Sequence, residues 1–200
     1  KFLISFFMTS LISLLLILQP DLGQTLLIGF SWIILIFVSG INIYLLVSLS
    51  LVSFLLLLYI IFYIPKFVYI KNRLLSFFNS ETGTHNFQSD KALDSITSGG
   101  LFGKGIGEGT LKNMVPEAHT DYIISVISEE FGVIVIMLIL ILFLTFIFSV
   151  LKKVNKEQND TVKLILVGSV SLILLQAMIH IGVNIRLFPT TGMTLPFLSY

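Results

Sequence analysis

Long apolar stretches alternate with shorter polar segments along most of this 200-residue chain. Five of the stretches reach the length of about 17 to 25 residues that an α-helix needs to cross the hydrocarbon core of a bilayer. The first exceeds the apolar core of a signal peptide and has no small-residue cleavage site behind it, so we expect a retained helix. The pattern predicts spans over residues 2–18, 24–40, 43–64, 133–151 and 164–183.

The long connection over residues 65–132 is predicted to be organised. Residues 67–78 mix aromatic and basic side chains, which is typical of a helix that lies in the headgroup region. A short helical stretch over 90–98 and a glycine-rich run over 99–109 follow. Apolar positions then recur with helical spacing between 122 and 131, which predicts a short helix that leads into the fourth span.

This short helix is expected to begin with Thr120 as its cap. Asp121 would then lie in the first turn, where the helix dipole favours the ionised carboxylate. Ser125, Ser128 and Glu129 fall on the face opposite the apolar positions.

The turn between the first two spans also carries a helix-start signal. Pro20 ends the first helix, and Asp21 with Gln24 has the spacing of a capping box for the second. A well-formed helix start explains these residues without any functional role.

Composition agrees with a membrane protein. Apolar residues make up 56% of the chain and charged residues only 12%, and the mean hydropathy is +1.00. A soluble domain carries about 25% charged residues, so we expect an all-α integral membrane protein, a polytopic helix bundle with one long extramembrane loop. The net charge of +1 is uninformative about nucleic acid, and we expect no nucleic-acid partner. The absence of cysteine excludes disulfides and cysteine-based zinc sites.

Lysines predict the orientation of the spans. Lys152, Lys153, Lys156 and Lys163 lie in the short connection between the last two spans, which should therefore be cytoplasmic. Residues 65–132 are then expected on the extracytoplasmic side.

The glycine-rich run does not match a nucleotide-binding loop. A Walker loop requires Gly where Ser98 stands and Ser or Thr where Gly105 follows Lys104, and Glu108 occupies the third glycine position of a dinucleotide fingerprint that starts at Gly103. We expect the glycines to allow positive φ angles and a close approach to a ligand or to other backbone.

Glu117, His119 and Asp121 alternate in the polar segment before the predicted short helix. In an extended backbone this spacing places all three side chains on one face. Such a face offers a base, an imidazole and a second carboxylate, which suits proton transfer or divalent-cation binding. A solvated acidic loop is the alternative.

Gln176, His180 and Asn184 form a polar stripe with i, i+4, i+8 spacing in the last span. Polar residues within a membrane usually face the bundle interior and form hydrogen bonds to other helices. We favour this packing role, and a proton relay through His180 is the alternative.

Taken together, five motifs resemble the SEDS family of peptidoglycan glycosyltransferases, which act in cell shape, elongation, division and sporulation. The resemblance covers the whole chain and is closer to the division-type, FtsW-like branch than to the RodA-like elongation branch. The motif residues that we expect to shape the site are Pro20, Asp21, Gly103, Gly105, Pro189, Gly192 and Pro196. The motifs are Gln19-Pro20-Asp21-Leu22-Gly23, residues 98–109, Pro116-Glu117-Ala118-His119-Thr120-Asp121, Glu129-Glu130-Phe131-Gly132 and residues 187–200.

The family has ten membrane helices, and this chain resembles the fifth to the ninth. The resemblance therefore implies that residues 1–200 are part of a SEDS membrane domain, and we expect a fragment or a truncated product. Many division-type members carry lysine where this chain has Thr191. Arg186 is close enough in sequence to replace a phosphate contact of that lysine.

The resemblance implies polymerisation of lipid II, with Asp121 as the general base for the acceptor hydroxyl. The candidates for binding substrate, and its diphosphate in particular, are Lys104, Lys112, Glu117, His119 and Arg186. A divalent cation, Mg²⁺ or Mn²⁺, is a further candidate for the diphosphate, with Glu117 and Asp121 as its ligands.

Lipid II, the nascent glycan and membrane lipid are the ligands that the family implies. A class B penicillin-binding transpeptidase and divisome proteins are the implied partners, and the implied location is the bacterial inner membrane at the division septum. A lipid II flippase and a non-catalytic scaffold for a transpeptidase are the alternatives. A flippase would need polar residues through the membrane, and a scaffold would not need the acidic trio.

Overall fold

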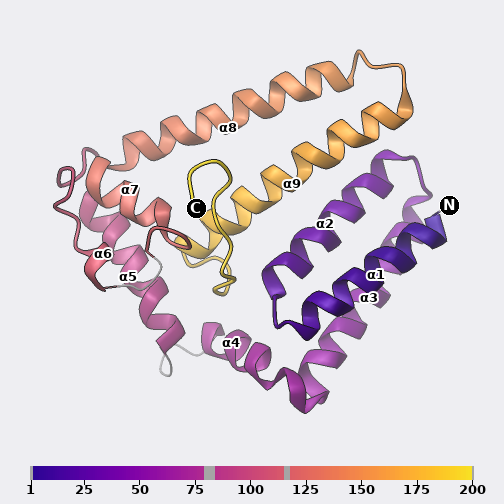
Figure 1. Cartoon of the computed structure of the whole chain (residues 1–200), viewed down its shortest axis with the longest axis horizontal. Coiled ribbons are helices and arrows are strands. Elements are labelled where there is room, and N and C mark those ends of the chain that lie inside the picture. Colours follow the sequence, from indigo (N-terminus) through magenta and orange to yellow (C-terminus); the bar gives the residue numbers. More distant parts are fainter. Residues whose placement is uncertain (1, 79–83, 115–117, 200) are drawn as a thin grey trace. The chain divides into compact units, whose positions relative to one another are not determined.

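The computed structural model describes residues 2–78, 84–114 and 118–199 (Figure 1). These residues form helices and connecting loops, with no β-strand among them. The elements are α1 (Phe2–Leu18), α2 (Leu22–Val38), α3 (Ile43–Tyr63), a 3₁₀ turn (Pro65–Phe67), α4 (Val68–Phe78), α5 (Thr84–Gly99), α6 (Leu111–Met114), α7 (Ile123–Phe131), α8 (Val133–Val154) and α9 (Asp160–Asn184).

The five predicted spans correspond to α1, α2, α3, α8 and α9. Within the described residues, α3, α8 and α9 are long and apolar enough to cross a membrane, whereas α1 and α2 are apolar helices of 17 residues each. The predicted all-α, polytopic membrane fold is confirmed.

The chain divides into two compact units. The first contains residues 1–75 and 150–175, and the second contains residues 76–149 and 176–200. Helices α8 and α9 therefore contribute one end to each unit. All candidate site residues except Pro20 and Asp21 belong to the second unit.

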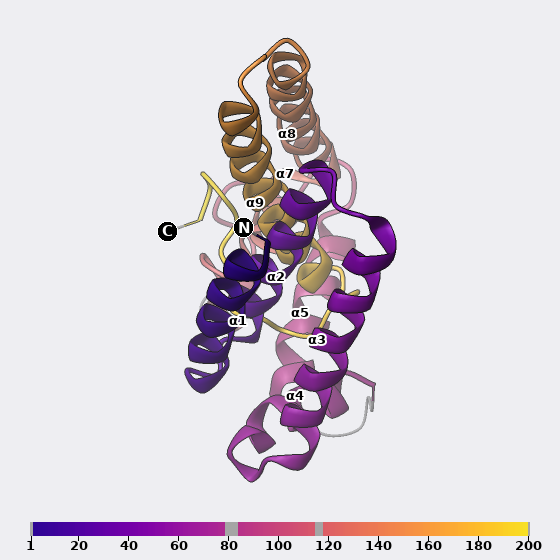
Figure 2. The same cartoon turned by 90° about the vertical axis from the view of Figure 1, so that its right-hand side faces the viewer.

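In the first unit, α1 and α2 pack side by side (Figures 1 and 2). The predicted start of α2 is confirmed, because the Asp21 carboxylate accepts a hydrogen bond of 2.9 Å from the Gln24 amide. Helix α4 lies against the same region, and its buried Ile70 joins a core cluster with Ile17 and Ile61. Asp21 therefore has a structural role that its sequence position explains.

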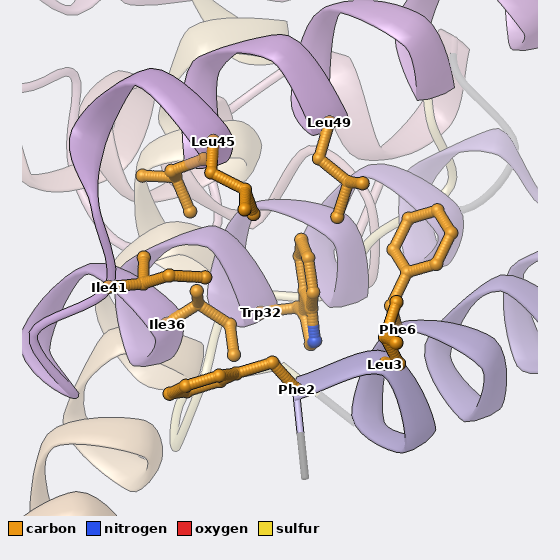
Figure 3. A pocket seen from close by; sticks show the side chains of 9 residues that line it. Phe2, Leu3, Phe6, Trp32, Ile36, Ile41, Leu45 and Leu49 are labelled. Atoms are coloured by element: carbon orange, nitrogen blue, oxygen red, sulfur yellow. The ribbon is translucent and has the colours of Figure 1, made fainter.

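The first unit also contains an apolar cavity of about 280 Å³. Figure 3 shows Trp32 of α2 among aromatic and aliphatic side chains of α1 and α3. The indole nitrogen of Trp32 donates to Ser5 Oγ at 2.9 Å. Among the described residues no ionisable side chain lines the cavity, and we assign no acid–base role to it.

In the second unit, α5 and α7 pack along each other, and α6 contacts both. A separate core cluster of Ile124, Ala177 and Leu195 joins α7, the end of α9 and the loop that follows it. This cluster places the beginning of α7 beside residues 185–199, and the candidate site lies there.

Candidate functional site

Asp121 lies in a turn over residues 118–122, immediately before α7. The one-face arrangement of the acidic trio required an extended backbone, and the described part of the segment is a turn instead. Hydrogen bonds to main-chain carbonyls explain the turn, because Ser199 Oγ donates to the Thr120 carbonyl and Asn184 Nδ2 donates to the Asp121 carbonyl at 3.1 Å. The turn is thus held by contacts that are distant in sequence.

The predicted cap of the short helix is also wrong. Tyr122, and not Thr120, is the N-cap residue, with φ −122° and ψ 26° and no capping side-chain hydrogen bond. The Thr120 carbonyl is engaged by Ser199 instead. Asp121 consequently precedes the helix, and the dipole acts on it from outside the first turn.

The loop after α9 reaches the Asp121 carboxylate. Gly192 has φ +69°, and a Cβ atom at this position would lie 3.7 Å from Asp121 Oδ2. The neighbouring Thr191 is buried, and its hydroxyl has no hydrogen-bond partner among the described residues. One wall beside Asp121 is therefore formed by backbone and a small polar side chain. Pro189 and Pro196 belong to the same loop.

The polar stripe of α9 is engaged in hydrogen bonds, as the packing interpretation predicts. Gln176 Nε2 donates to the Thr194 carbonyl at 3.0 Å, and His180 Nδ1 lies 2.8 Å from the Met193 carbonyl. Asn184 contacts α7 and the turn before it. Two of the three residues thus bind the loop after α9, and one binds α7.

Helix α7 buries its polar face. Ser125, Ser128 and Glu129 are at most 1% exposed, whereas Phe131 on the opposite face is 40% exposed. Tyr122 and Val126, two of the apolar positions, are buried as well, so both faces are covered and Phe131 is the exposed apolar position. The helical pattern did not predict that the polar face would be buried. Polar groups on this buried face form hydrogen bonds with other parts of the second unit, and the Glu129 carboxylate accepts the most.

The Glu129 carboxylate accepts four hydrogen bonds. Oε1 accepts from Lys104 Nζ at 3.0 Å, from the Thr110 amide at 3.0 Å and from the Thr110 hydroxyl at 2.9 Å, while Oε2 accepts from the Leu111 amide at 3.0 Å. Burial alone raises the pKa of Glu129, but these donors outweigh it and lower the pKa to about 2. Glu129 is therefore ionised and fixes the end of the glycine-rich run against α7.

The glycine-rich run follows the backbone of α7 closely, as expected for tight packing. Lys104 and Gly105 donate their amides to the carbonyls of Glu129 and Glu130 at 2.9 and 3.1 Å. Gly103 has φ +79°, and a Cβ there would lie 2.2 Å from the Glu130 carbonyl oxygen. Only glycine fits this position, because both the φ angle and the approach exclude a side chain.

The candidate cations differ in their surroundings. Lys104 pairs with buried Glu129, whereas Arg186 pairs with Asp90, whose side chain is 42% exposed. Lys112 belongs to α6, but its side chain lies outside the described part of the structure. Of the two described cations, only Arg186 has a partner that is open to solvent.

The acidic trio is described only in part. Glu117 lies outside the described residues, and His119 is exposed in the turn that precedes Asp121. Within the described residues, no group of three or more His, Asp or Glu side chains converges on a metal position. The divalent cation stays a prediction.

Sequence reasoning places Glu129 in a motif but does not predict its four bonds. A signal is present, because an acidic residue interrupts a segment that is otherwise rich in apolar residues. The link from Asn184 to Asp121 has no such signal, since these residues are 63 positions apart.

Comparison with known proteins assigns the chain to a family. The FtsW, RodA and SpoVE family, described as cell cycle proteins, matches residues 1–200. The chain belongs to this family. The prediction from the five motifs is therefore confirmed.

Individual relatives in the FtsW, RodA and SpoVE family agree. The chain is 37% identical over 187 residues to a probable peptidoglycan glycosyltransferase FtsW of Caulobacter vibrioides, which covers 93% of this chain and 47% of that protein. It is 36% identical over 191 residues to stage V sporulation protein E of Bacillus subtilis, with coverage of 94% and 51%. The chain thus spans about half the length of the relatives it matches.

A solved structure is similar as well. It belongs to work on "Structural coordination of polymerization and crosslinking by a peptidoglycan synthase complex", and the matched chain has a TM-score of 0.73 and 26% identity. The match covers 96% of this chain and 55% of the other.

Proposed function

We propose that the complete protein is a peptidoglycan glycosyltransferase that polymerises lipid II during bacterial cell division. Family membership along the whole chain supports the proposal, as do relatives named probable peptidoglycan glycosyltransferase FtsW. The observation that carries it is the placement of Asp121, whose backbone is held from α9 while the glycine loop passes beside its carboxylate. A carboxylate on a held backbone, with a glycine rather than a side chain beside it, suits a general base.

In this proposal Asp121 accepts the proton of the 4-hydroxyl group of the incoming lipid II sugar. The freed oxygen attacks the anomeric carbon of the growing glycan and forms the new glycosidic bond. The bond from that carbon to the diphosphate breaks, and the lipid diphosphate leaves with the electron pair. General-base catalysis by a positioned carboxylate contributes about 10²- to 10⁴-fold to a rate.

We assign the contact with the leaving diphosphate to Arg186 before Lys104. An arginine can bind phosphate oxygens with two parallel hydrogen bonds. Its partner Asp90 is partly exposed, so solvent screens that ion pair and diphosphate can compete for the guanidinium. Releasing Lys104 would leave the Glu129 carboxylate buried and short of one donor. Lys112 remains a further candidate.

A divalent cation held by Asp121 and Glu117 would add positive charge at the diphosphate. The carboxylate of Asp121 is a suitable ligand for Mg²⁺ or Mn²⁺. The proton transfer to Asp121 proceeds without the cation.

We propose a multi-pass location in the bacterial inner membrane, at the division septum, with residues 65–132 outside the cytoplasm. The lysines at the end of α8, in the connection and at the start of α9 support this orientation. The chain has no cysteine, so single cysteines can be introduced without background labelling. A cysteine at Thr97 should react with an impermeant reagent from outside and one at Asn159 only from inside, and the reverse pattern would refute the orientation.

We also propose that the complete protein works with a class B penicillin-binding transpeptidase and other divisome proteins. The similar solved structure is that of a peptidoglycan synthase complex described for both polymerization and crosslinking. A flippase role receives less support, because hydrogen bonds within the second unit engage the polar groups of the α9 stripe. A purely structural scaffold would not require the acidic residues around Asp121.

The proposal is tested by incubating the purified complete protein with lipid II in detergent and separating the products by gel electrophoresis. Long glycan strands are expected in the absence of any other polymerase. Transfer of lipid II across vesicle membranes without glycan strands would favour the flippase instead.

A further inference from the structure

The end of α9 contacts both sides of the Asp121 turn through a single amide side chain. Asn184 is 0% exposed, and all its polar atoms have partners. Its Oδ1 accepts from Ser125 Oγ at 2.7 Å and from the Ser125 amide at 3.3 Å. Its Nδ2 donates to the Asp121 carbonyl at 3.1 Å and to the His180 carbonyl at 2.9 Å.

These bonds join residues that would otherwise move separately. Ser125 lies in the first turn of α7, and Asp121 lies just before that helix, where Tyr122 provides no capping side chain. Asn184 therefore supplies the connection between the turn and the helix that a local cap would normally supply. The orientation of the Asp121 backbone depends on this contact.

His180 supports Asn184 from one helical turn away. The Met193 carbonyl can only accept a hydrogen bond, so His180 Nδ1 donates to it at 2.8 Å. His180 Nε2 lies 3.3 Å from Asn184 Nδ2, and the His180 carbonyl accepts one of the two N–H groups of that amide. The same pair thus holds the Asp121 turn on one side and, through Met193, the segment next to Gly192 on the other.

We propose that Asn184 is a positioning residue that sets the Asp121 carboxylate for proton transfer, with His180 bracing the amide. The inference rests on the proposed function of Asp121 as the general base. A misplacement of about 1 Å at a reacting group can cost about 100-fold in rate. The loss of Asn184 should therefore lower kcat without weakening substrate binding, because its amide is buried.

The chain provides a matched control in Gln176. It lies on the same stripe, two turns earlier, and donates one hydrogen bond to the Thr194 carbonyl of the loop after α9. No hydrogen bond connects Gln176 to Asp121 among those described, so its loss removes a tertiary bond and leaves the turn intact. Packing alone predicts that any loss of kcat follows the loss of stability in both variants. Positioning predicts a loss of kcat in the Asn184 variant that its loss of stability does not explain.

The experiment compares Asn184→Leu and Gln176→Leu in the complete protein, with lipid II polymerisation and thermal unfolding measured on the same samples. Asn184→Leu should lower kcat by about 10- to 100-fold with KM within about twofold of the parent. Gln176→Leu should change kcat by less than about threefold, with a smaller decrease in Tm because it loses one hydrogen bond. Equal kcat losses in both variants, or a normal kcat in Asn184→Leu, would overturn the proposal.

A second readout does not depend on enzymatic activity. Hydrogen exchange of the peptide over residues 118–126 should become faster in Asn184→Leu and stay unchanged in Gln176→Leu. If Asn184→Leu does not fold, Ser125→Ala removes one bond to Asn184 and should give a smaller change in the same direction. If exchange is unchanged in every folded variant, Asn184 does not position the turn. If exchange is faster in Asn184→Leu but polymerisation does not need Asp121, the proposed function is refuted and the positioning of the turn by Asn184 is not.

Discussion

The ammonium group of Lys104 lies 3.0 Å from the carboxylate of Glu129, which is 1% exposed. The same carboxylate accepts the amides of Thr110 and Leu111, so one buried charge joins the glycine-rich run to α7. Donors surround it so completely that its pKa falls to about 2 although burial alone would raise it. Glu129 is therefore an anchor of the loop, and its ionisation can be measured through stability.

We expect the stability of the fold to decrease in acid because of Glu129. The pKa of the Glu129 carboxyl group is about 2 in the folded protein, compared with an ordinary value of 4.5. A lowered pKa stabilises the folded state above pH 4.5, and this contribution is lost as the pH falls from about 4.5 toward about 2. Its full size is on the order of 3 kcal/mol. Thermal unfolding in detergent across this pH range measures it.

Glu129→Gln is the control for the acid effect. The NH₂ group of the glutamine cannot accept the hydrogen bonds that the carboxylate oxygen accepts. We therefore expect the free energy of unfolding to fall by about 2 to 3 kcal/mol at neutral pH. The variant should also lack the decrease in stability that protonation of Glu129 causes in the parent protein as the pH falls. Glu130→Gln, at the neighbouring and less buried position, should retain that decrease. A parent-like acid transition in Glu129→Gln would show that other carboxylates cause it.

Gly103→Ala should disrupt the contact between the glycine-rich run and α7. The new Cβ would lie 2.2 Å from the Glu130 carbonyl oxygen, at a φ of +79°. We expect the free energy of unfolding to fall by more than about 3 kcal/mol. The glycine-rich run must move away from α7, and the alanine must also adopt a strained φ angle.

Gly100→Ala is the matched comparison for that variant. Gly100 also has a positive φ of +60°, but nothing lies within 4 Å of its new Cβ. Only the backbone strain of about 1 to 2 kcal/mol should appear. Equal destabilisation of both variants in thermal unfolding would mean that the close approach at Gly103 has no energetic importance.

Arg186→Gln should weaken the binding of the lipid diphosphate. We expect KM for lipid II to rise by about tenfold, since a charge-assisted hydrogen bond contributes about 1.5 to 3 kcal/mol. Asp90→Asn removes the ion-pair partner and keeps the cation, so its KM should stay equal or fall. If both substitutions raise KM alike, the ion pair matters for structure and Arg186 is not the diphosphate ligand.

Much of this fold is predictable from local sequence. The spans follow from apolar length, and Asp21 caps α2 as its spacing with Gln24 indicates. The glycine-rich run adopts positive φ angles and packs closely, because glycine alone has the freedom to do so. Each of these features depends on residues near one another in the chain.

The turn at Asp121 is not predictable in the same way. The alternating acidic trio would share one face in an extended backbone, and Thr120 has the character of a helix cap. Both patterns are overridden by Ser199 and Asn184, which bind the carbonyls of Thr120 and Asp121 from distant positions. A local pattern carries no information about such tertiary contacts, so the site geometry emerges only in the fold.

The central claim is that Asp121 is the general base, and one substitution tests it directly. Asp121→Asn keeps the side-chain size and removes the basic oxygen. In the complete protein we predict a loss of lipid II polymerisation of about 100-fold or more. Lipid II binding and Tm should stay close to those of the parent. Polymerisation at a near-normal rate by this variant would contradict the account.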